Sequence, residues 1–398
     1  MEASEVGGGA ARYTYRLRVG SGTERLLLSE WDRCRWVWNQ CVAESKASYK
    51  RGEKVGPAML DKMCTQWRAD NQWLRAGASI PQKQIIRDFG RSRAKAIRDI
   101  ADKLPMRRRA GMPGFRRKHL VDPSLNYTRN GFRLKDGKLK LAGDITVNVV
   151  WSRELPSVPS SVRIYRDSLG HWYASFVVQT EAQPLPATGA VLGVDWGVKE
   201  IATTTSDDHD LPHPGFGKKA AAELAAADKA VSRRRRPNGQ PQSKGYHKAK
   251  KRRARLLRRV ARQRQDYARK WAKKAVRDHD CLAVEDFRPK FLARSTMAKK
   301  AADAAITATK QALIDMSHKH GRTVLLVHPA HTTMDCAQCG ARAKHALPLG
   351  ERTYNCTACG AVSPRDKNSA RVMLNRAGLN PDGVDRRRPP QPRAGKAA

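Results

Sequence analysis

Four cysteines near the carboxyl end of this 398-residue chain constrain its fold more than any other feature. They form two Cys-x-x-Cys pairs, Cys336 with Cys339 and Cys356 with Cys359, and sixteen residues separate the pairs. This spacing is typical of a zinc ribbon, in which two turns each present two thiolates to one tetrahedral Zn²⁺. A glycine follows each pair, as a tight turn with a positive φ requires. We therefore predict one structural Zn²⁺ here, in preference to free or disulfide-bonded cysteines.

The segment after the second cysteine pair is predicted to begin a helix. Ser363 is expected to be its N-cap, Pro364 its first residue, and Asp366 the partner of Ser363 in a capping box. An aspartate at the positive end of a helix is stabilising and needs no functional explanation. A metal-binding role for Asp366 is the alternative, and two acidic positions elsewhere in the chain favour it.

Two apolar segments that are predicted to be strands lead to acidic residues. The first, 191–194, leads to Asp195, and the second, 281–284, leads to Glu285 and Asp286. A carboxylate at the end of a buried strand is costly unless it is paired or binds a cation. Because successive side chains on a strand point to opposite faces, only one of Glu285 and Asp286 is expected to reach such a cation. Three acids delivered by two strands and a helix suit an oxygen-ligand Mg²⁺ site, where two ions about 3.5–4 Å apart can hydrolyse a phosphodiester.

The motifs around these acids resemble a known family. GVDWGVKEIA around Asp195, LAVEDF around Glu285 and the DKNSA run that starts at Asp366, combined with the cysteine pairs, are similar to the three split RuvC-like nuclease motifs of TnpB proteins. TnpB proteins are transposon-encoded, RNA-guided DNA endonucleases related to type V CRISPR effectors. The resemblance covers nearly the whole chain, including the amino-terminal patterns YTYRL and CRWVWN. Trp196 stands where the family often has Leu and Ser369 where Ala is commoner, and neither departure removes a ligand.

The resemblance implies which residues carry the chemistry. Asp195, Glu285 and Asp366 would be the catalytic carboxylates and would bind two Mg²⁺ ions, while the four cysteines would bind one structural Zn²⁺. The implied partners are a guide RNA and a target double-stranded DNA, bound by one protein monomer with one RNA. The expected function is RNA-guided, metal-dependent hydrolysis of DNA at a site specified by the guide and a short adjacent motif. The alternatives are a catalytically inactive RNA-guided DNA-binding repressor and a transposase that transfers DNA strands.

The net charge of the chain indicates what kind of partner it binds. A formal net charge of +41 and a pI near 10.6 would make the isolated chain repel itself, so a polyanionic partner is expected. No stretch approaches eighteen apolar residues, which favours nucleic acid over a membrane surface. The first ten residues lack the apolar core of a secretory signal, and the cysteines outside the two pairs are scattered, as free thiols in a reducing compartment would be. We expect a cytoplasmic protein that joins the bacterial nucleoid when it binds DNA.

The whole chain is predicted to be a multidomain α+β protein. A small antiparallel β-barrel, the wedge domain of the family, is expected over 11–23 and 105–181, with a helical recognition domain inserted at 24–104. A Pro-rich linker over 182–190 leads to an RNase H-like α/β RuvC nuclease domain over 191–332 and 363–378, with the zinc ribbon inserted at 333–362. Residues 1–10 and 379–398 are expected to be disordered.

Periodicity predicts individual elements within these domains. A half-buried strand begins near residue 11, and a helix from Glu24 carries one apolar stripe made of Leu27, Trp31, Cys34, Trp38 and Cys41. Further helices are expected over 59–70, 81–104, 220–236, 246–279 and 295–320. A polar loop over 207–214, a buried strand over 322–327 and hairpin turns at 136–137 and 169–170 complete the prediction.

Basic and polar residues in three places are candidate nucleic-acid contacts. The start of the helix over 81–104 is predicted to contact bases, since glutamine can pair with adenine in the major groove, through Gln82, Lys83 and Gln84. An irregular basic loop is predicted to bind phosphates through Arg107, Arg108, Arg109, Arg116, Arg117 and Lys118. The long helix over 246–279 is predicted to hold a guide–target duplex, with Arg252, Arg253, Arg258 and Arg259 among its contacts. The alternative for each place is an ordinary solvated surface.

Overall fold

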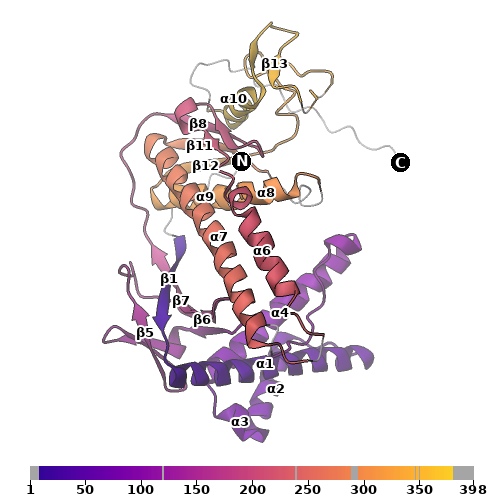
Figure 1. The fold of residues 1–398 in the computed structure, drawn as a ribbon, viewed down its shortest axis with the longest axis vertical. Helices are drawn as coiled ribbons and strands as arrows, with labels where there is room; N and C mark the ends of the chain where they lie inside the picture. Colours follow the sequence, from indigo (N-terminus) through magenta and orange to yellow (C-terminus); the bar gives the residue numbers. More distant parts are fainter. Residues whose placement is uncertain are drawn as a thin grey trace. The chain divides into compact units, whose positions relative to one another are not determined.

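The computed structural model describes residues 9–118, 121–237, 240–287, 295–345, 347–348 and 350–379. These residues form two compact units, 9–180 and 181–379, whose elements Figure 1 labels along the chain. Residues 1–8 and 380–398, which were predicted to be disordered, lie outside the described residues. Gly9 and Ala10, which were assigned to the same amino-terminal segment, already belong to the first strand.

The amino-terminal unit is built on one seven-stranded antiparallel sheet in the order β2-β6-β7-β1-β5-β4-β3. Its strands are β1 (Gly9–Arg18), β2 (Ser124–Thr128), β3 (Phe132–Lys135), β4 (Lys138–Leu141), β5 (Ile145–Val150), β6 (Ser161–Arg166) and β7 (Trp172–Thr180). The two edge strands, β2 and β3, are consecutive in the chain and are joined by a single 3₁₀ turn, η2 (Arg129–Gly131). The sheet therefore nearly closes on itself, which confirms the predicted barrel-like architecture.

Local sequence explains how this sheet is shaped. Along β1 the arginines point outward, while Tyr15 and Leu17 are buried in the core of the unit. At the turn between β3 and β4, Asp136 has a φ of 53° and Gly137 a φ of 69°. Two consecutive positive φ values define the type I′ turn that suits the twist of a two-residue hairpin, as the Asp-Gly pair predicted.

Helices cover the barrel and share its hydrophobic core. They are α1 (Ser21–Lys50), α2 (Pro57–Asp70), α3 (Gln72–Arg75) and α4 (Ser79–Ala101), followed by the 3₁₀ turn η1 (Met106–Arg108). The predicted apolar stripe of α1 is buried throughout and belongs to the same core as Tyr15 and Phe176 of the sheet. α1 begins at Ser21, three residues before the predicted start, because Gly20 in extended conformation already serves as its N-cap.

The carboxyl-terminal unit contains a five-stranded sheet in the order β10-β9-β8-β11-β12. Its strands are β8 (Val191–Trp196), β9 (Glu200–Thr204), β10 (Leu211–Pro212), β11 (Cys281–Glu285) and β12 (Thr323–Val327). β8, β9 and β10 are antiparallel neighbours, whereas β11 is parallel to both β8 and β12. The carboxyl ends of β8 and β11 therefore meet at one edge of the sheet. β12 was predicted to be buried, but it is an edge strand and Leu326 is 52% exposed.

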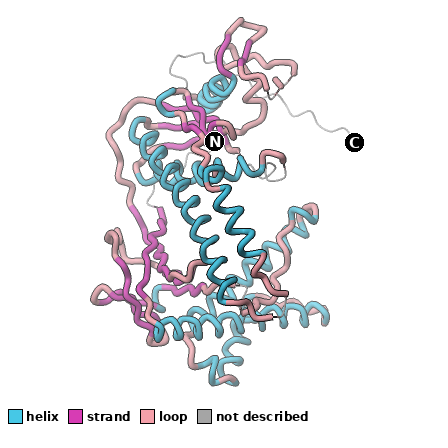
Figure 2. Tube along the Cα trace, viewed as in Figure 1, coloured by secondary structure: helices cyan, strands magenta, loops and turns pink. Residues whose placement is uncertain are grey.

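Helices and turns follow these strands in the chain. They are η3 (Asp207–His209), α5 (Phe216–Lys219), α6 (Ala221–Ser232), α7 (Lys244–Asp278), α8 (Ala298–Ala304), α9 (Ile306–Lys319) and α10 (Arg365–Ala377). Figure 2 shows α6 and α7 running side by side as a helical hairpin. The single helix predicted over 295–320 is wrong, because Ala305 adopts a φ of 52° and separates α8 from α9. The polar loop predicted over 207–214 contains η3 and the short strand β10. Within the described ranges, no helix is long and apolar enough to cross a membrane.

The last helix, α10, packs across β8, β9 and β11. The contact is close at Gly193 in β8, where a Cβ atom would lie 2.1 Å from the backbone oxygen of Ala370. Only glycine fits at this position without moving the helix, since no real Cβ atom approaches a carbonyl so closely. This contact brings the first turn of α10, with Asp366, onto the sheet that carries Asp195.

Candidate functional site

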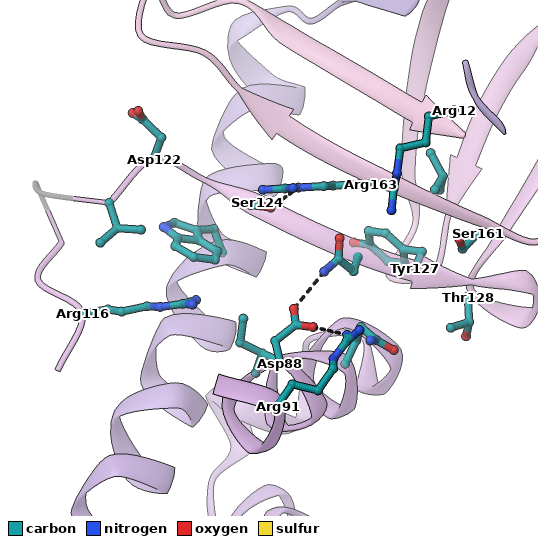
Figure 3. Close-up of a pocket in the computed structure, with 16 residues that line it drawn as sticks. Arg12, Asp88, Arg91, Arg116, Asp122, Ser124, Tyr127, Thr128, Ser161 and Arg163 are labelled. Carbon is teal, nitrogen blue, oxygen red and sulfur yellow. Dashed lines mark hydrogen bonds and ion pairs between the residues drawn. The ribbon is translucent and has the colours of Figure 1, made fainter. Parts of the chain in front are cut away.

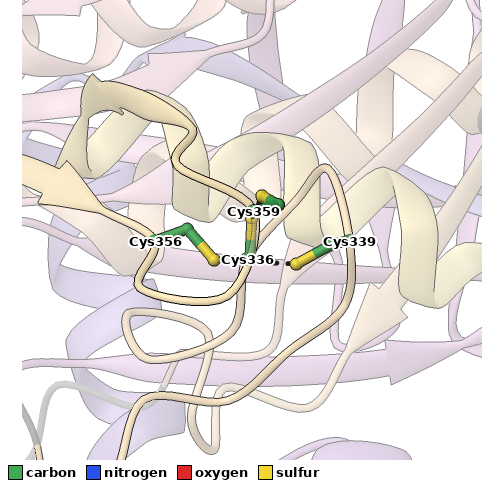
Figure 4. A group of neighbouring side chains, drawn as sticks. All are labelled: Cys336, Cys339, Cys356 and Cys359. Atoms are coloured by element: carbon green, nitrogen blue, oxygen red, sulfur yellow. Dashed lines mark hydrogen bonds between the residues drawn. The ribbon is translucent and has the colours of Figure 1, made fainter.

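The four predicted zinc cysteines lie together (Figure 4). Their sulfur atoms all lie within 4.8 Å of one another, with 3.8 Å between Cys336 and Cys359 and 3.6 Å between Cys339 and Cys356. A tetrahedral zinc site with Zn–S bonds of about 2.3 Å has sulfur–sulfur edges of about 3.8 Å. The donor set and its dimensions therefore fit one Zn²⁺ ion.

Two turns of the same design hold these sulfurs. The N–H of Gly340 donates to the carbonyl of Cys336 over 3.0 Å, and the N–H of Gly360 donates to the carbonyl of Cys356 over 2.9 Å. Both glycines have the predicted positive φ, 71° and 73°. Burial opposes ionisation of Cys356, but hydrogen bonds from the backbone N–H groups of Cys359 and Ala358 and from the Cys339 and Cys359 side chains lower its pKa. Burial raises the pKa of Cys336. The backbone donors at Cys356 favour the thiolate form that binds a metal.

A short hairpin connects this cysteine cluster to α10. β13 (Thr353–Asn355) pairs with β14 (Val362–Pro364), and Ser363 lies opposite Tyr354. The predicted capping box is wrong, because Ser363 belongs to this strand and Pro364 occupies the N-cap position without a side-chain bond. Asp366 therefore lies in the first turn of α10 with no capping partner at Ser363. Its side chain is 40% exposed, and its recorded ion pair is a long one of 3.7 Å with Arg352.

The two strand-borne acids lie on neighbouring strands. Val194 of β8 is opposite Val284 of β11, so the next residues, Asp195 and Glu285, follow at the same edge of the sheet. Trp196 holds Glu285 at two points. Its backbone N–H donates to the Oε2 of Glu285 over 3.3 Å, and its indole Nε1–H donates to the Glu285 carbonyl over 3.1 Å. The aromatic residue that replaces the Leu common in the TnpB family thus supplies a hydrogen bond that Leu cannot make.

The pKa of Asp195 is affected by both other acids. Burial raises the pKa of Asp195 well above its ordinary value, and the nearby carboxylates of Glu285 and Asp366 raise it further. Burial also raises the pKa of Glu285 to about 7, although the Trp196 N–H and the Lys310 ammonium oppose the shift. Two carboxylates near enough to raise the pKa of a third suit a divalent cation, because a cation offsets the repulsion between them.

The carboxylate set is more open than the cysteine cluster. Among the described residues, the four cysteines form the one group of three or more His, Cys, Asp or Glu side chains whose donor atoms all lie within 4.8 Å of one another. A set of carboxylates that shares two ions about 3.5–4 Å apart spans a wider space than the donors of a single ion. Asp286, which was not expected to reach the cation, accepts from Lys310 over 2.9 Å.

The three residues predicted to contact bases differ in how exposed their side chains are. Gln82 is a correction, since it is fully buried and its amide bonds to the Leu74 carbonyl and to Arg68. Lys83 is exposed and pairs with Asp61 over 3.3 Å. Gln84, by contrast, lines a pocket of about 570 Å³ between α1, α4, β2 and β6. The helical period explains this difference, because Gln82 lies on the core side of α4 with Ile85 and Phe89.

This pocket, shown in Figure 3, is lined by polar and apolar side chains, with arginines and aspartates among them. Asp88 accepts from Asn126 over 2.9 Å and pairs with Arg91 over 2.6 Å, and Arg163 donates to Ser124 over 2.8 Å. Two further arginines, Arg12 and Arg116, also line it. The pocket combines cations with amide and hydroxyl groups, which are the groups that contact phosphates and base edges.

The predicted phosphate-binding loop is only partly free for such a role. Arg116 is a correction, because its guanidinium stacks on Trp38 at 3.5 Å from the ring centroid and burial lowers its pKa. Lys118 pairs with Asp32 over 3.1 Å, and Arg109 donates to the Leu104 carbonyl over 2.6 Å. The remaining members of the loop set are exposed: Arg107, Arg108 and Arg117.

The predicted duplex-binding arginines of α7 also divide into two groups. Arg253 pairs with Asp228, and Arg259 pairs with Glu223 over 3.0 Å, so both join α7 to α6. These pairs are exposed and therefore weak. Arg252 is exposed and Arg258 is half-buried. The two acids of α6 thus orient part of the basic surface of α7, which the sequence alone did not predict.

Three family models match stretches of this chain, and two of those stretches contain the candidate site residues. Residues 175–296 match the OrfB/IS605 family model, described as a probable transposase, and residues 308–373 match the Cas12f1-like TNB domain. Residues 10–54 match the helix-turn-helix domain model of OrfB/IS605. The first match contains Asp195 and Glu285, and the second contains the cysteines and Asp366. The resemblance to the TnpB family is confirmed.

Relatives of this TnpB-like chain extend along most of its length. A Streptomyces pristinaespiralis protein with the provisional name RNA-guided DNA endonuclease is 28% identical over 348 residues, which cover 85% of this chain and 82% of the relative. An Escherichia coli K12 protein, with the provisional name RNA-guided DNA endonuclease InsQ, is 25% identical and 91% of each chain is covered. A solved Cas12f1–guide RNA–target DNA complex matches with a TM-score of 0.53 at 12% identity, covering 94% of this chain and 99% of that one. At that identity the likeness establishes the fold alone.

Proposed function

We propose that this chain is an RNA-guided endonuclease that cuts DNA by metal-dependent hydrolysis of a phosphodiester bond. The observation that carries the proposal is that Asp195 and Glu285 lie at the neighbouring carboxyl ends of β8 and β11, with Asp366 of α10 near enough to raise the pKa of Asp195. The sheet supports a RuvC-like assignment, because three antiparallel strands followed by two parallel ones suit the RNase H-like architecture that the family resemblance implies. The names of the full-length relatives support the guidance by RNA.

Each side chain has a distinct part in this function. Asp195 lies within the electrostatic reach of both other acids, so it suits a ligand shared by two Mg²⁺ ions, with Glu285 and Asp366 on either side. Such ions, when bound, supply an activated water and stabilise the leaving oxygen of the phosphodiester. Trp196 fixes one oxygen of Glu285, which leaves the other free for a metal. The four cysteines hold a structural Zn²⁺, since a closed set of four thiolates leaves no position for substrate.

We assign the remaining surfaces to nucleic acid. The net charge of +41 and the basic helix α7 suit the backbone of a guide–target duplex, while base pairing with the guide supplies most of the sequence specificity. In the amino-terminal unit, the barrel and its helices correspond to the wedge and recognition domains of the family. The polar pocket around Gln84 and Asn126 is the surface that would contact the short motif beside the target. Such a protein would act in the cytoplasm, on the nucleoid.

The decisive experiment uses the protein purified from cells together with its own RNA. The co-purifying RNA is sequenced, matching DNA is supplied with Mg²⁺, and cleavage is compared for wild type, Asp195→Ala and the exposed control Asp208→Asn. We expect wild type and Asp208→Asn to cut, and Asp195→Ala to lose cutting by more than about 10³-fold while DNA binding is unchanged. Equal loss of binding and cleavage in Asp195→Ala would contradict the assigned role.

A strand-transfer transposase is the second candidate, and the description of the matching family model favours it. The same reactions separate the two functions. A hydrolytic nuclease yields free 3′-hydroxyl and 5′-phosphate ends, whereas strand transfer yields products joined to a second DNA. Absence of co-purified RNA together with joined products would replace the proposal, and an intact target that is still bound in the presence of guide RNA would make the chain a repressor.

The pocket assignment has its own matched pair of variants. Gln84→Ala removes a pocket amide without disturbing the core, so we expect it to change which motif beside the target is preferred, by about tenfold or more. Gln82→Ala removes a buried amide, so it should lower thermal stability and leave the preference unchanged. A library of target-adjacent sequences measures both. Unaltered preference in Gln84→Ala would remove that residue from the recognition surface.

A further inference from the structure

The first turn of α10 has no side-chain cap at its N-terminus. Pro364 at the N-cap position makes no side-chain hydrogen bond, and the turn carries Asp366. Helix ends without a cap fray readily, since their first N–H groups have no partner in the helix. A metal-binding carboxylate in such a turn needs support from outside the helix. The two residues after Asp366, Lys367 and Asn368, provide it in two directions.

Lys367 anchors the turn to the sheet. Its ammonium group donates to the carbonyl of Thr204 over 2.9 Å and pairs with Asp210 over 2.8 Å and with Asp207 over 2.6 Å. The Lys367 side chain is only 14% exposed, so its bonds to Thr204 and Asp210 are partly shielded from water, whereas the Asp207 side chain is 92% exposed. Thr204 follows Thr203, which lies opposite Asp195 across the β8–β9 pair. Lys367 therefore ties the turn to the strand beside Asp195.

Asn368 anchors the same turn to the cysteine cluster. Its Nδ2 donates to the carbonyl of Asp335 over 2.8 Å, and its Oδ1 accepts from the N–H of Ala337 over 3.0 Å. These two backbone groups flank Cys336, one of the four zinc ligands we predict. Asn368 is 3% exposed, so both bonds are buried, and removing its side chain would leave two buried backbone groups without a partner.

Asp335, whose backbone carbonyl accepts from Asn368, is itself held by two ion pairs. The carboxylate of Asp335 pairs with Arg342 over 2.6 Å and with Arg376 of α10 over 2.7 Å. Asn375, two turns further along α10, donates to the Ala337 carbonyl over 2.5 Å. The segment that carries the cysteines thus contacts α10 near both ends of the helix. Beside Asp366 the contacts are made by Asn368 and by Arg365, which donates to the carbonyls of Pro348 and Arg352 over 2.9 Å and 2.8 Å.

We propose that Lys367 and Asn368 are positioning residues that hold Asp366 between the sheet and the cysteine cluster, so that binding of Zn²⁺ strengthens binding of Mg²⁺. This inference rests on the proposed function, because it assumes that Asp366 is a magnesium ligand. Groups that orient a metal ligand typically change metal affinity by about 10–100-fold when they are removed. Asn375 offers the matched control, since it bonds the same turn of the cluster but lies far along the helix from Asp366.

The test measures Mg²⁺ binding without any cleavage reaction. Thermal unfolding of the purified chain is followed across a MgCl₂ titration, which gives a Mg²⁺ midpoint for each protein. We expect Lys367→Met and Asn368→Ala each to raise the midpoint about tenfold, Lys367→Arg to restore it in part, and Asn375→Ala to lower the melting temperature without moving the midpoint. Zinc content, measured on each sample, should be unchanged in the Lys367 variants.

A zinc-selective chelator completes the test. Removing Zn²⁺ should raise the Mg²⁺ midpoint of the wild type about tenfold but have a smaller effect in Asn368→Ala, because the buried connection through Asn368 is already cut. Equal effects of the chelator in both proteins would overturn the zinc coupling, and unmoved midpoints in Asn368→Ala and Lys367→Met would overturn the positioning role. If the wild type and Asp366→Asn respond identically to Mg²⁺, the proposed function fails instead, so the two failures are distinguishable.

Discussion

The cysteine cluster and the carboxylate set are both connected to the first turn of α10, but their side chains are brought together in different ways. The cysteines come from one stretch of chain, and two repeated turns bring their sulfurs to tetrahedral spacing. The carboxylates come from two strands and a helix; burial raises the pKa of Asp195 and of Glu285, and the other two acids raise that of Asp195 further. The donor set of the first site fits a closed structural ion, whereas ionising the second is unfavourable unless a cation is bound. Stability and catalytic potential are therefore separated in space, although Asn368 connects them.

Breaking the cysteine cluster should give the largest effect on folding. In Cys356→Ser the fourth thiolate is lost, and structural zinc sites contribute about 10–16 kcal/mol of apparent binding free energy in small zinc domains. We expect loss of bound zinc and rapid protease cleavage within 333–362, measured by metal analysis and limited proteolysis. Asp195→Asn is the contrasting variant, which should keep its zinc and resist protease. A protease-resistant Cys356→Ser chain would show that the ribbon folds without metal.

The next largest effect is expected where α10 meets the sheet. Gly193→Val places a side chain where even a Cβ would lie 2.1 Å from the Ala370 carbonyl, so the helix must move away. We expect a loss of about 3 kcal/mol of unfolding free energy and no Mg²⁺-dependent stabilisation, by thermal and chemical unfolding. Gly245→Ala in α7 is the control, since its nearest contact is 3.7 Å and alanine favours helix. A stable, Mg²⁺-responsive Gly193→Val protein would mean that α10 docks differently.

A pH titration tests this difference between the two sites, because it measures the free-energy cost of ionising the carboxylate set. Without Mg²⁺, the pKa of Glu285 is raised by burial from 4.5 to about 7, so the folded chain holds this proton more tightly than the unfolded chain does. The free energy of unfolding should therefore fall as pH rises from about 4.5 to 7 and then level off. Glu285→Gln should abolish this fall and be about 3 kcal/mol more stable than wild type at pH 8.

The same titration has a control with metal. Adding Mg²⁺ at pH 8 should stabilise the wild type and leave Glu285→Gln nearly unchanged, because the cation neutralises the repulsion only where the carboxylate remains. Chemical unfolding curves at pH 5 and pH 8 provide the measurement. A wild type that becomes more stable between these values, without metal, would contradict the sign of the Glu285 effect.

The smallest effect is expected at Trp196, which fixes Glu285 without belonging to the carboxylate set. Trp196→Phe keeps the aromatic contact with Trp271 but loses the indole N–H that donates to the Glu285 carbonyl. We expect a loss of about 1–2 kcal/mol of stability and a weaker response to Mg²⁺, by thermal shift. Trp196→Leu, which restores the residue common in the family, should cost slightly more because the packing is lost as well. No change in Trp196→Phe would make the indole bond unimportant.

How far the sequence predicts the structure differs between the two sites for a physical reason. Cysteine spacing is local information, so the cluster, its positive-φ glycines and a donor set that fits Zn²⁺ were predictable. The three acids were identified through motifs, but their convergence depends on parallel pairing of β8 with β11 and on Gly193, which periodicity does not reveal. The capping box failed because pairing of Ser363 in β14 outweighed a local cap preference. Gln82 failed because helix phase, not residue type, decided its burial.

The docking of α10 over Gly193 also bears on how the protein behaves while it is being made. The amino-terminal unit and the strands β8 to β12 leave the ribosome before α10, since synthesis proceeds from the amino end and domains fold as units. Until α10 emerges, Asp195 and Glu285 have no third acid beside them. An unfinished chain thus lacks the third acid, and translation itself delays the moment at which the carboxylate set is complete.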